Sequence, residues 1–182
     1  MNGRIGQIEK ISKICKKNKI KLIEDSAHAI GSYCRNKHSG NEGIAASFSF
    51  SMPKLITMGQ GGAIITNNLK LAKSLRLFKN FGRKKDGVDI HNFLGYNFKI
   101  TDLQSVLALS QLQDIKKRTL IKKKIFQRYL KNLKNNKKII MFQMKKNETP
   151  WSVDIYANKI QKIAQILKKK KYKHTPSVST IE

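Results

Sequence analysis

The stretch that decides the fold is IEDSAHAIGSYCRNKHSGNEGIAASFSFSMPKLITMGQGGAIITNN, residues 23–68. Three segments in and around it, at 21–25, 44–50 and 63–66, have the composition of short buried strands. Loops that contain Gly and Asn separate these segments, and a helical pattern follows at 69–79. Strands that alternate with helices predict an α/β fold whose sheet is at least partly parallel.

The flanking sequence extends this pattern in both directions. Isoleucines recur at helical spacing between residues 5 and 14, which predicts an amphipathic helix before the first strand. Thr101 and Gln104 have the spacing of a capping box, and the apolar pattern behind them predicts a long helix that continues to residue 133. Beyond residue 135 two strand-like segments and a helix follow. We therefore predict two units, 1–134 and a smaller α+β domain at 135–182.

Composition and charge exclude several classes of protein. No run of about 18 apolar residues or signal peptide is visible, which predicts a cytoplasmic protein without a membrane segment. Cys15 and Cys34 lack metal-binding spacing, so we assign them no disulfide and no metal. The net charge of +27 comes almost entirely from lysines without adjacent aromatic residues, which favours a solvated surface over a nucleic-acid interface.

Two residues suggest a chemical function before any family is considered. Asp25 ends a predicted strand, where open α/β sheets place their ligands, and Lys54 lies in a loop shortly after the next strand. Lysine forms Schiff bases with carbonyls, and a carboxylate can keep a pyridine nitrogen protonated, so the pair suits pyridoxal phosphate. Either residue alone has an ordinary structural explanation.

The order of the motifs is more specific than any one of them. EDSAH, HSGNEG, SFSFSMPKLITMGQGG and AIITNN occur in sequence, followed by LRLFKNFGR, LGYNFKITDLQSVLALSQL and PWSVDIY. This series resembles the DegT/DnrJ/StrS family of pyridoxal-phosphate-dependent sugar-nucleotide aminotransferases over nearly the whole chain. The resemblance implies part of a fold-type I large domain, with a mostly parallel sheet and flanking helices, and the start of a small C-terminal domain. Family members are about twice as long, which implies a fragment lacking their N-terminal part and the end of the small domain.

The resemblance also implies roles for individual residues. Lys54 would carry the cofactor and move the proton during catalysis, and Asp25 would pair with the pyridine nitrogen. His28 would approach the phenolic oxygen of the cofactor ring, and Ser49 would bind the cofactor phosphate. Asn97 would reach the phosphate of a neighbouring subunit, which implies a homodimer.

The reaction implied is transfer of an amino group, with glutamate as donor, to a keto-sugar nucleotide for polysaccharide or glycoconjugate synthesis. A dehydratase relative has His in place of the lysine, so Lys54 favours transamination. Two alternatives stay open. A catalytically inert remnant would associate with a partner subunit without binding the cofactor through Lys54, and a nucleic-acid-binding protein would bind any duplex in a strongly salt-dependent manner.

Overall fold

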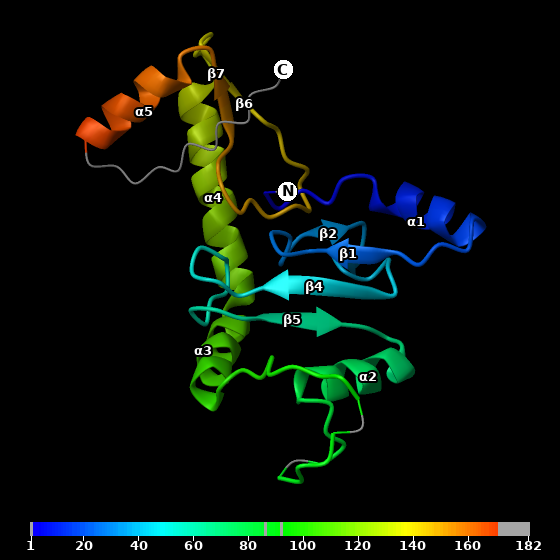
Figure 1. Ribbon diagram of the computed structural model, residues 1–182. Helices are drawn as coiled ribbons and strands as arrows, with labels where there is room; N and C mark the ends of the chain where they lie inside the picture. Colours follow the sequence, from blue (N-terminus) through cyan, green and yellow to red (C-terminus); the bar gives the residue numbers. More distant parts are fainter. Residues whose placement is uncertain (1, 86, 92, 171–182) are drawn as a thin grey trace.

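The computed structural model describes residues 2–85, 87–91 and 93–170 of the chain, and Figure 1 shows the arrangement of its elements. In chain order they are α1 (Ile8–Lys17), β1 (Ile23–Asp25), β2 (Tyr33–Cys34), β3 (Lys37–His38), β4 (Ala45–Ser49), β5 (Gly62–Ile65), α2 (Leu69–Lys79), α3 (Asp102–Gln113), α4 (Ile115–Leu133), β6 (Ile139–Met141), β7 (Ile155–Ala157) and α5 (Ile160–Lys169). Helices and strands are mixed along the chain, and the predicted α/β class is confirmed.

The main sheet has three strands in the order β1-β4-β5. β1 and β4 are parallel, with Asp25 opposite Ser47, whereas β5 runs antiparallel to β4, with Gly62 opposite Ser49. The expectation of a partly parallel sheet is therefore confirmed, and within the described residues one of the two pairings is parallel. The carboxyl ends of β1 and β4 lie at the same edge of the sheet, so the segments that follow them meet there.

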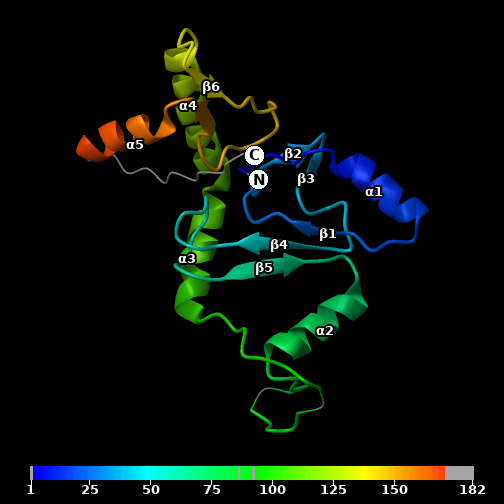
Figure 2. The same cartoon turned by 45° about the horizontal axis from the view of Figure 1, so that its top comes forward.

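Local signals explain where the helices begin. The Asn68 side chain accepts a hydrogen bond from the backbone of Leu71 and caps α2, which has the predicted bounds. Thr101 and Gln104 form the predicted capping box at the start of α3. The long helix expected from there is two helices that meet at Asp114, and they run as a nearly continuous column past the carboxyl end of β4 in both ribbon views (Figures 1 and 2).

The connector at 33–43 contains a hairpin of two very short strands, β2 and β3, although the sequence indicated only a loop. The buried carboxylate of Glu24 organises the end of this connector. It accepts backbone hydrogen bonds from Gly40, Glu42 and Gly43 at 2.9, 2.7 and 2.8 Å. A buried carboxylate that receives three N–H donors is well satisfied, so Glu24 fixes this loop against β1.

The second unit lies at the far end of α4 from α3, where β6 and β7 form an antiparallel pair beside α5 (Figure 1). This arrangement fits the small α+β domain predicted at 135–182, although the division itself stays a prediction. Residues 171–182 of that predicted domain, including the motif HTPSVSTIE, lie outside the described residues.

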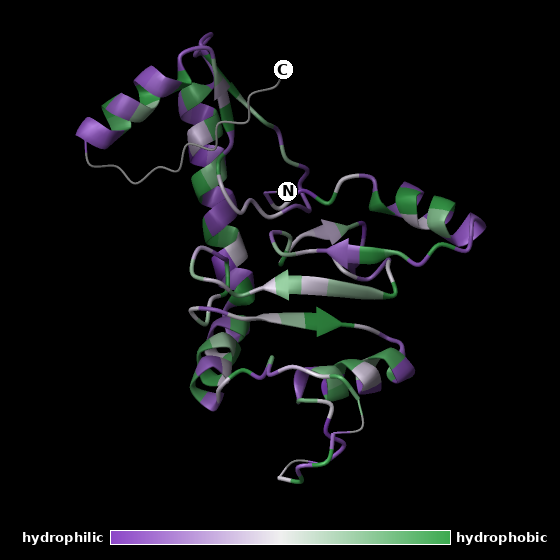
Figure 3. Ribbon diagram, viewed as in Figure 1, coloured by the Kyte–Doolittle hydropathy of each residue, from purple (hydrophilic) through white to green (hydrophobic). Residues whose placement is uncertain are grey.

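The apolar core is concentrated around β4 and the loop that follows it. Its buried members there are Ala45, Ala46, Phe48, Leu55, Ile56 and Met58. Many large apolar side chains remain exposed elsewhere, particularly between residues 90 and 112, and Figure 3 shows the apolar colouring on α2 and α3. Among the described residues, no helix has both the length and the apolar character needed to cross a membrane.

Candidate active site

Asp25 is the last residue of β1, and it lies at the edge where the parallel strands end. Its Oδ1 accepts a hydrogen bond from the backbone N–H of Ala27 at 3.0 Å, which directs the chain into the turn that carries His28. The residue is exposed, so its carboxylate remains accessible to a ligand. This is the position in which α/β sheets bind small molecules.

Lys54 lies in the loop between the antiparallel strands β4 and β5. The backbone N–H of Lys54 donates to the carbonyl of Ser51 at 3.0 Å, and the following residues Leu55 and Ile56 are buried in the core. Gln111 of α3 binds the same loop after Lys54. Its Oε1 accepts a hydrogen bond from the backbone N–H of Thr57 at 3.1 Å, and its Nε2 donates to the backbone carbonyl of Thr57 at 2.6 Å. The lysine is therefore attached to a backbone that is fixed on both sides.

The surroundings of Lys54 favour its reactive form. Burial lowers the pKa of the Lys54 amine, and the nearby Asp25 carboxylate opposes that shift by raising the pKa. The two charges thus influence each other, although Asp25 ends β1 and Lys54 lies in the loop after β4. A lowered pKa increases the fraction of neutral amine at physiological pH, which is the form that attacks a carbonyl.

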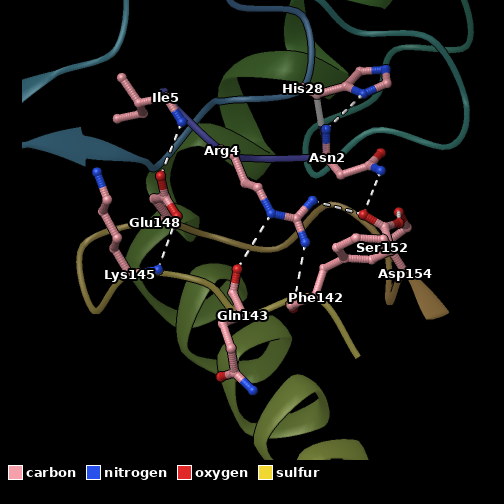
Figure 4. Close-up of polar contacts among 10 residues, drawn as sticks. All are labelled: Asn2, Arg4, Ile5, His28, Phe142, Gln143, Lys145, Glu148, Ser152 and Asp154. Carbon is pink, nitrogen blue, oxygen red and sulfur yellow. Dashed lines mark hydrogen bonds and ion pairs between the residues drawn. The ribbon is translucent and has the colours of Figure 1, made fainter. Parts of the chain in front are cut away.

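His28 follows Asp25 by three positions and contacts the segment that carries Trp151. Its ring stacks on the ring of Trp151 with centroids 4.0 Å apart and an interplanar angle of 26°. Its Nδ1 accepts a hydrogen bond from the backbone of Asn2 at 3.4 Å, which can be followed in Figure 4. Burial lowers the pKa of His28, and the positive charge of Lys54 lowers it further. The neutral imidazole is therefore favoured.

Trp151 is a member of this cluster that the sequence did not predict. Its Nε1–H donates to the carbonyl of Pro53 at 2.9 Å, and the Nζ of Lys54 lies 4.8 Å from the centroid of its ring. The motif PWSVDIY had marked this segment only as the start of the small domain. Trp151 is the one tryptophan of the chain, which could have marked it as a candidate site residue. Its sequence neighbours, however, do not indicate contact with a loop 98 positions earlier.

Ser49 ends β4, five positions before Lys54. Its hydroxyl is within 3.2 Å of the Ser51 hydroxyl, and it accepts a weak hydrogen bond from the Ser51 backbone at 3.4 Å. Two hydroxyls therefore lie together at the start of the lysine loop. Hydroxyl groups can donate to a phosphate oxygen without carrying charge, so their chemistry agrees with the predicted role of Ser49.

Asn97 lies outside this cluster. Its backbone forms an isolated antiparallel bridge with Asn80 after α2, and the residue is exposed. No described contact brings it to Asp25, His28 or Lys54. The predicted role of Asn97 across a subunit interface remains a prediction.

The residues that meet here fit pyridoxal phosphate in their chemistry. Asp25 offers an accessible carboxylate for a protonated ring nitrogen, and Lys54 offers an amine with a lowered pKa for the carbonyl. Ser49 and Ser51 add hydroxyl donors of the type that a phosphate needs. The roles of these residues toward the cofactor are expectations that rest on this match.

The α/β fold, together with a lysine beside a strand-end carboxylate, is characteristic of the pyridoxal-phosphate-dependent aminotransferases. Within that class, the chain belongs to the DegT/DnrJ/EryC1/StrS aminotransferase family, whose sequence profile it matches over residues 1–177. The resemblance inferred from the motifs is thereby confirmed. Enzymes of this family depend on pyridoxal phosphate.

Two curated relatives match a little over 60% of this chain. UDP-4-amino-4,6-dideoxy-N-acetyl-beta-L-altrosamine transaminase of Helicobacter pylori is 39% identical over 113 residues, which are 61% of this chain and 30% of that protein. GDP-perosamine synthase of Caulobacter vibrioides is 34% identical over 113 residues, or 62% of this chain and 30% of that protein.

Solved structures extend the match to most of the chain. Helicobacter pylori PseC, an aminotransferase in the biosynthesis of pseudoaminic acid, superimposes with a TM-score of 0.86 at 28% identity, covering 93% of this chain and 48% of PseC. The E. coli GDP-4-keto-6-deoxy-D-mannose-3-dehydratase with bound hydrated pyridoxal phosphate has a TM-score of 0.88 at 18% identity, covering 98% and 52%, and supports the fold alone. The chain thus spans about half the length of these structures.

Proposed function

We propose that this chain carries the cofactor lysine of an enzyme that transfers an amino group, with glutamate as donor, to a keto-sugar nucleotide. The product would be an amino sugar for polysaccharide or glycoconjugate synthesis. The observation that supports this most directly is that Lys54 and His28 both contact the Trp151 ring, at 4.8 and 4.0 Å, close after the strand end at Asp25. The names of the curated relatives, both of which make amino sugars attached to a nucleotide, support the class of substrate.

Each residue has a task in this reaction. Pyridoxal phosphate, when bound, supplies a carbonyl that condenses with amines and a ring that withdraws electrons from the reacting carbon. Asp25 would accept a hydrogen bond from the ring nitrogen and so favour its protonated form. Lys54 would hold the cofactor through Nζ, and its neutral amine would be the group that takes up and returns the proton. The neutral imidazole of His28 lies beside Lys54, where it can donate one hydrogen bond without adding positive charge.

Lys54 also supports transamination over dehydration. A histidine at this position cannot attach to the cofactor through an amine, whereas lysine can both attach and transfer the proton. The lowered pKa of Lys54 favours both steps, because each begins from the neutral amine.

The decisive experiment is a titration of the purified chain with pyridoxal phosphate, followed by the visible absorbance of lysine-bound cofactor. Borohydride reduction and peptide mass spectrometry then identify the modified residue. We expect saturable binding that traps the cofactor on Lys54 and is lost in Lys54→Ala. The matched control is Lys70→Ala, which removes a lysine from exposed α2 without touching the site. Equal absorbance in the wild type and Lys54→Ala would contradict the proposal.

A second candidate, a chain that associates with another subunit without carrying the cofactor, is favoured by one observation. Large apolar side chains around Asn97 are exposed, among them Leu94 at 80% and Phe98 at 62%. Such a surface is typical of an interface. The same titration separates the candidates, because association without cofactor trapping at Lys54 supports this second reading. A homodimer built on this surface is compatible with both.

A further inference from the structure

The segment that carries Trp151 is fixed to the turn that follows Asp25. The backbone N–H of Tyr33 donates to the carbonyl of Asn147 at 2.8 Å, and the N–H of Thr149 donates to the Ser32 hydroxyl, also at 2.8 Å. The Thr149 hydroxyl in turn donates to the carbonyl of Gly31 at 2.6 Å. The two bonds of Thr149 are buried, so they hold the segment firmly against the turn.

Gly31 makes this close approach possible. It has a φ of +77°, and a Cβ at this position would lie 2.5 Å from the side chain of Thr119 in α4. Only glycine is compatible with both the torsion and the available space. The turn, the segment just before Trp151 and α4 therefore meet at one point.

A second set of contacts holds the other side of the segment, and we call it the N-terminal tether (Figure 4). The Oδ2 of Asp154 accepts hydrogen bonds from Arg4 Nη1 at 2.8 Å and from Asn2 Nδ2 at 2.6 Å. The carboxylate of Glu148 accepts from the backbone N–H of Ile5 at 3.1 Å. Glu148 and Asp154 lie three positions before and after Trp151, so the segment that carries the indole is restrained on both sides.

Trp151 then contacts the lysine loop in two distinct ways. Its Nε1–H holds the backbone at Pro53, the residue before Lys54, at 2.9 Å. Its ring lies below the Lys54 ammonium at 4.8 Å, a distance at which a cation and an aromatic face attract each other. It also stacks on His28 at 4.0 Å. One side chain thus contacts the loop backbone, the amine and the imidazole.

We propose that Trp151 is a positioning residue, which holds the Lys54 amine and the adjacent loop in place beside Asp25 and His28. The inference deepens the proposed function, because it assigns a small-domain residue to the environment of the cofactor lysine. The indole face stabilises the ammonium form of Lys54, and the Nε1–H restrains the loop. The two contacts have separate consequences, so they can be tested separately.

The first test follows the reactivity of Lys54 without any cofactor. The wild type, Trp151→Phe and Trp151→Leu are methylated with formaldehyde and a mild reductant across a pH series, and each lysine is quantified by peptide mass spectrometry. Leucine keeps apolar cover but has no aromatic face, so we expect the apparent pKa of Lys54 to fall by about half a unit in Trp151→Leu. Phenylalanine retains a ring, so its shift is smaller. The other lysines of the same molecule are internal controls.

The second test addresses the Nε1–H. Both variants lose this donor, so amide hydrogen exchange at Lys54 and Met58 should become about fivefold faster in each. Circular dichroism checks the fold, and Trp151→Phe keeps this test valid if Trp151→Leu is misfolded. Unchanged exchange in a folded variant, together with an unchanged Lys54 titration, would overturn the positioning role. Because no cofactor is present, failure of pyridoxal phosphate to bind leaves these results unaffected.

Discussion

Arg4 and Asp154, which lie 150 positions apart, form an ion pair with 2.8 Å between Nη1 and Oδ2. Both side chains are largely shielded, with exposed fractions of 28% and 21%. Because Asn2 also donates to the same oxygen, Asp154 joins the start of the chain to the segment that carries Trp151 through two partners. Shielding and shared hydrogen bonds make such a pair stronger than an exposed one.

Replacement of Asp154 by alanine should therefore destabilise the fold by about 1–3 kcal/mol, because it leaves the Arg4 guanidinium without its carboxylate. Urea denaturation followed by circular dichroism measures the change. The matched control is Asp89→Ala, which removes the partner of Arg83 from a pair whose aspartate is 80% exposed. That change should cost less than about 1 kcal/mol. Equal losses in the two variants would refute a special role for Asp154.

Glu24 supports the connector before β4 through three backbone N–H donors. Glu24→Gln keeps the size of the side chain but replaces one acceptor oxygen with an NH₂ group that faces donors. We expect a loss of about 2–3 kcal/mol in the free energy of unfolding, measured by urea denaturation. Glu9→Gln on α1 is the control, since Glu9 has one exposed ion-pair partner, Arg35. A Glu24→Gln variant as stable as this control would contradict the assignment.

His28 should make the stability depend on pH. Burial and Lys54 hold its folded-state pKa below 6.5, so the unfolded chain binds more protons as the pH falls through that value. The contribution of His28 is therefore fully present above about pH 6.5 and is lost as the pH falls from there through the lower, folded-state pKa. Melting temperatures of the wild type and His28→Gln between pH 7.5 and 5.5 should show a steeper decline in the wild type. Parallel declines would count against the shift.

Asp25 should set the reactivity of Lys54. Its carboxylate raises the pKa of the lysine against the effect of burial, so Asp25→Asn should lower that pKa further. Reductive methylation of Lys54 then reaches half its maximum at a lower pH than in the wild type. Asp102→Asn, at the exposed start of α3, is the charge-matched control and should leave the Lys54 profile unchanged. A rise in the Lys54 pKa in Asp25→Asn would show that the two groups do not interact as described.

Self-association should depend on the apolar surface around Asn97. Phe98→Glu places a charge among exposed apolar side chains, and it should shift the protein toward monomer in light scattering coupled to size-exclusion chromatography. Ile140→Glu on β6 is the control, because Ile140 has a similar exposure of 60% but lies in the second unit. An equal effect of both changes would indicate nonspecific association of apolar surfaces.

Periodicity and capping signals predicted much of this fold. The bounds of α2 and the capping box at Thr101 agree with the structure because both depend on residues within one or two turns. The break at Asp114 was not located, since neither glycine nor proline marks it. The strands of the β2–β3 hairpin have two residues each, which is too short for an alternating pattern to be visible.

The residues of the candidate site, too, were predicted only in part from the sequence. Asp25, His28 and Lys54 were predicted together, and the structure brings them to one edge of the sheet. Trp151 was missed because its contact with Lys54 depends on how the second unit packs on the first, which no local pattern encodes. Asn97 lies outside the cluster, and its role at an interface with another subunit stays a prediction.

Gln111 connects α3 directly to the backbone of the loop that carries Lys54. By donating to and accepting from the backbone of Thr57, its side-chain amide takes the place of a neighbouring β-strand for the lysine loop. Elsewhere on α3 the apolar side chains of Leu103, Val106 and Leu109 are exposed. A subunit that docks on these side chains would press on the same rigid helix that fixes the loop. If a second subunit docks there, one amide group would connect the interface with the backbone of the lysine loop.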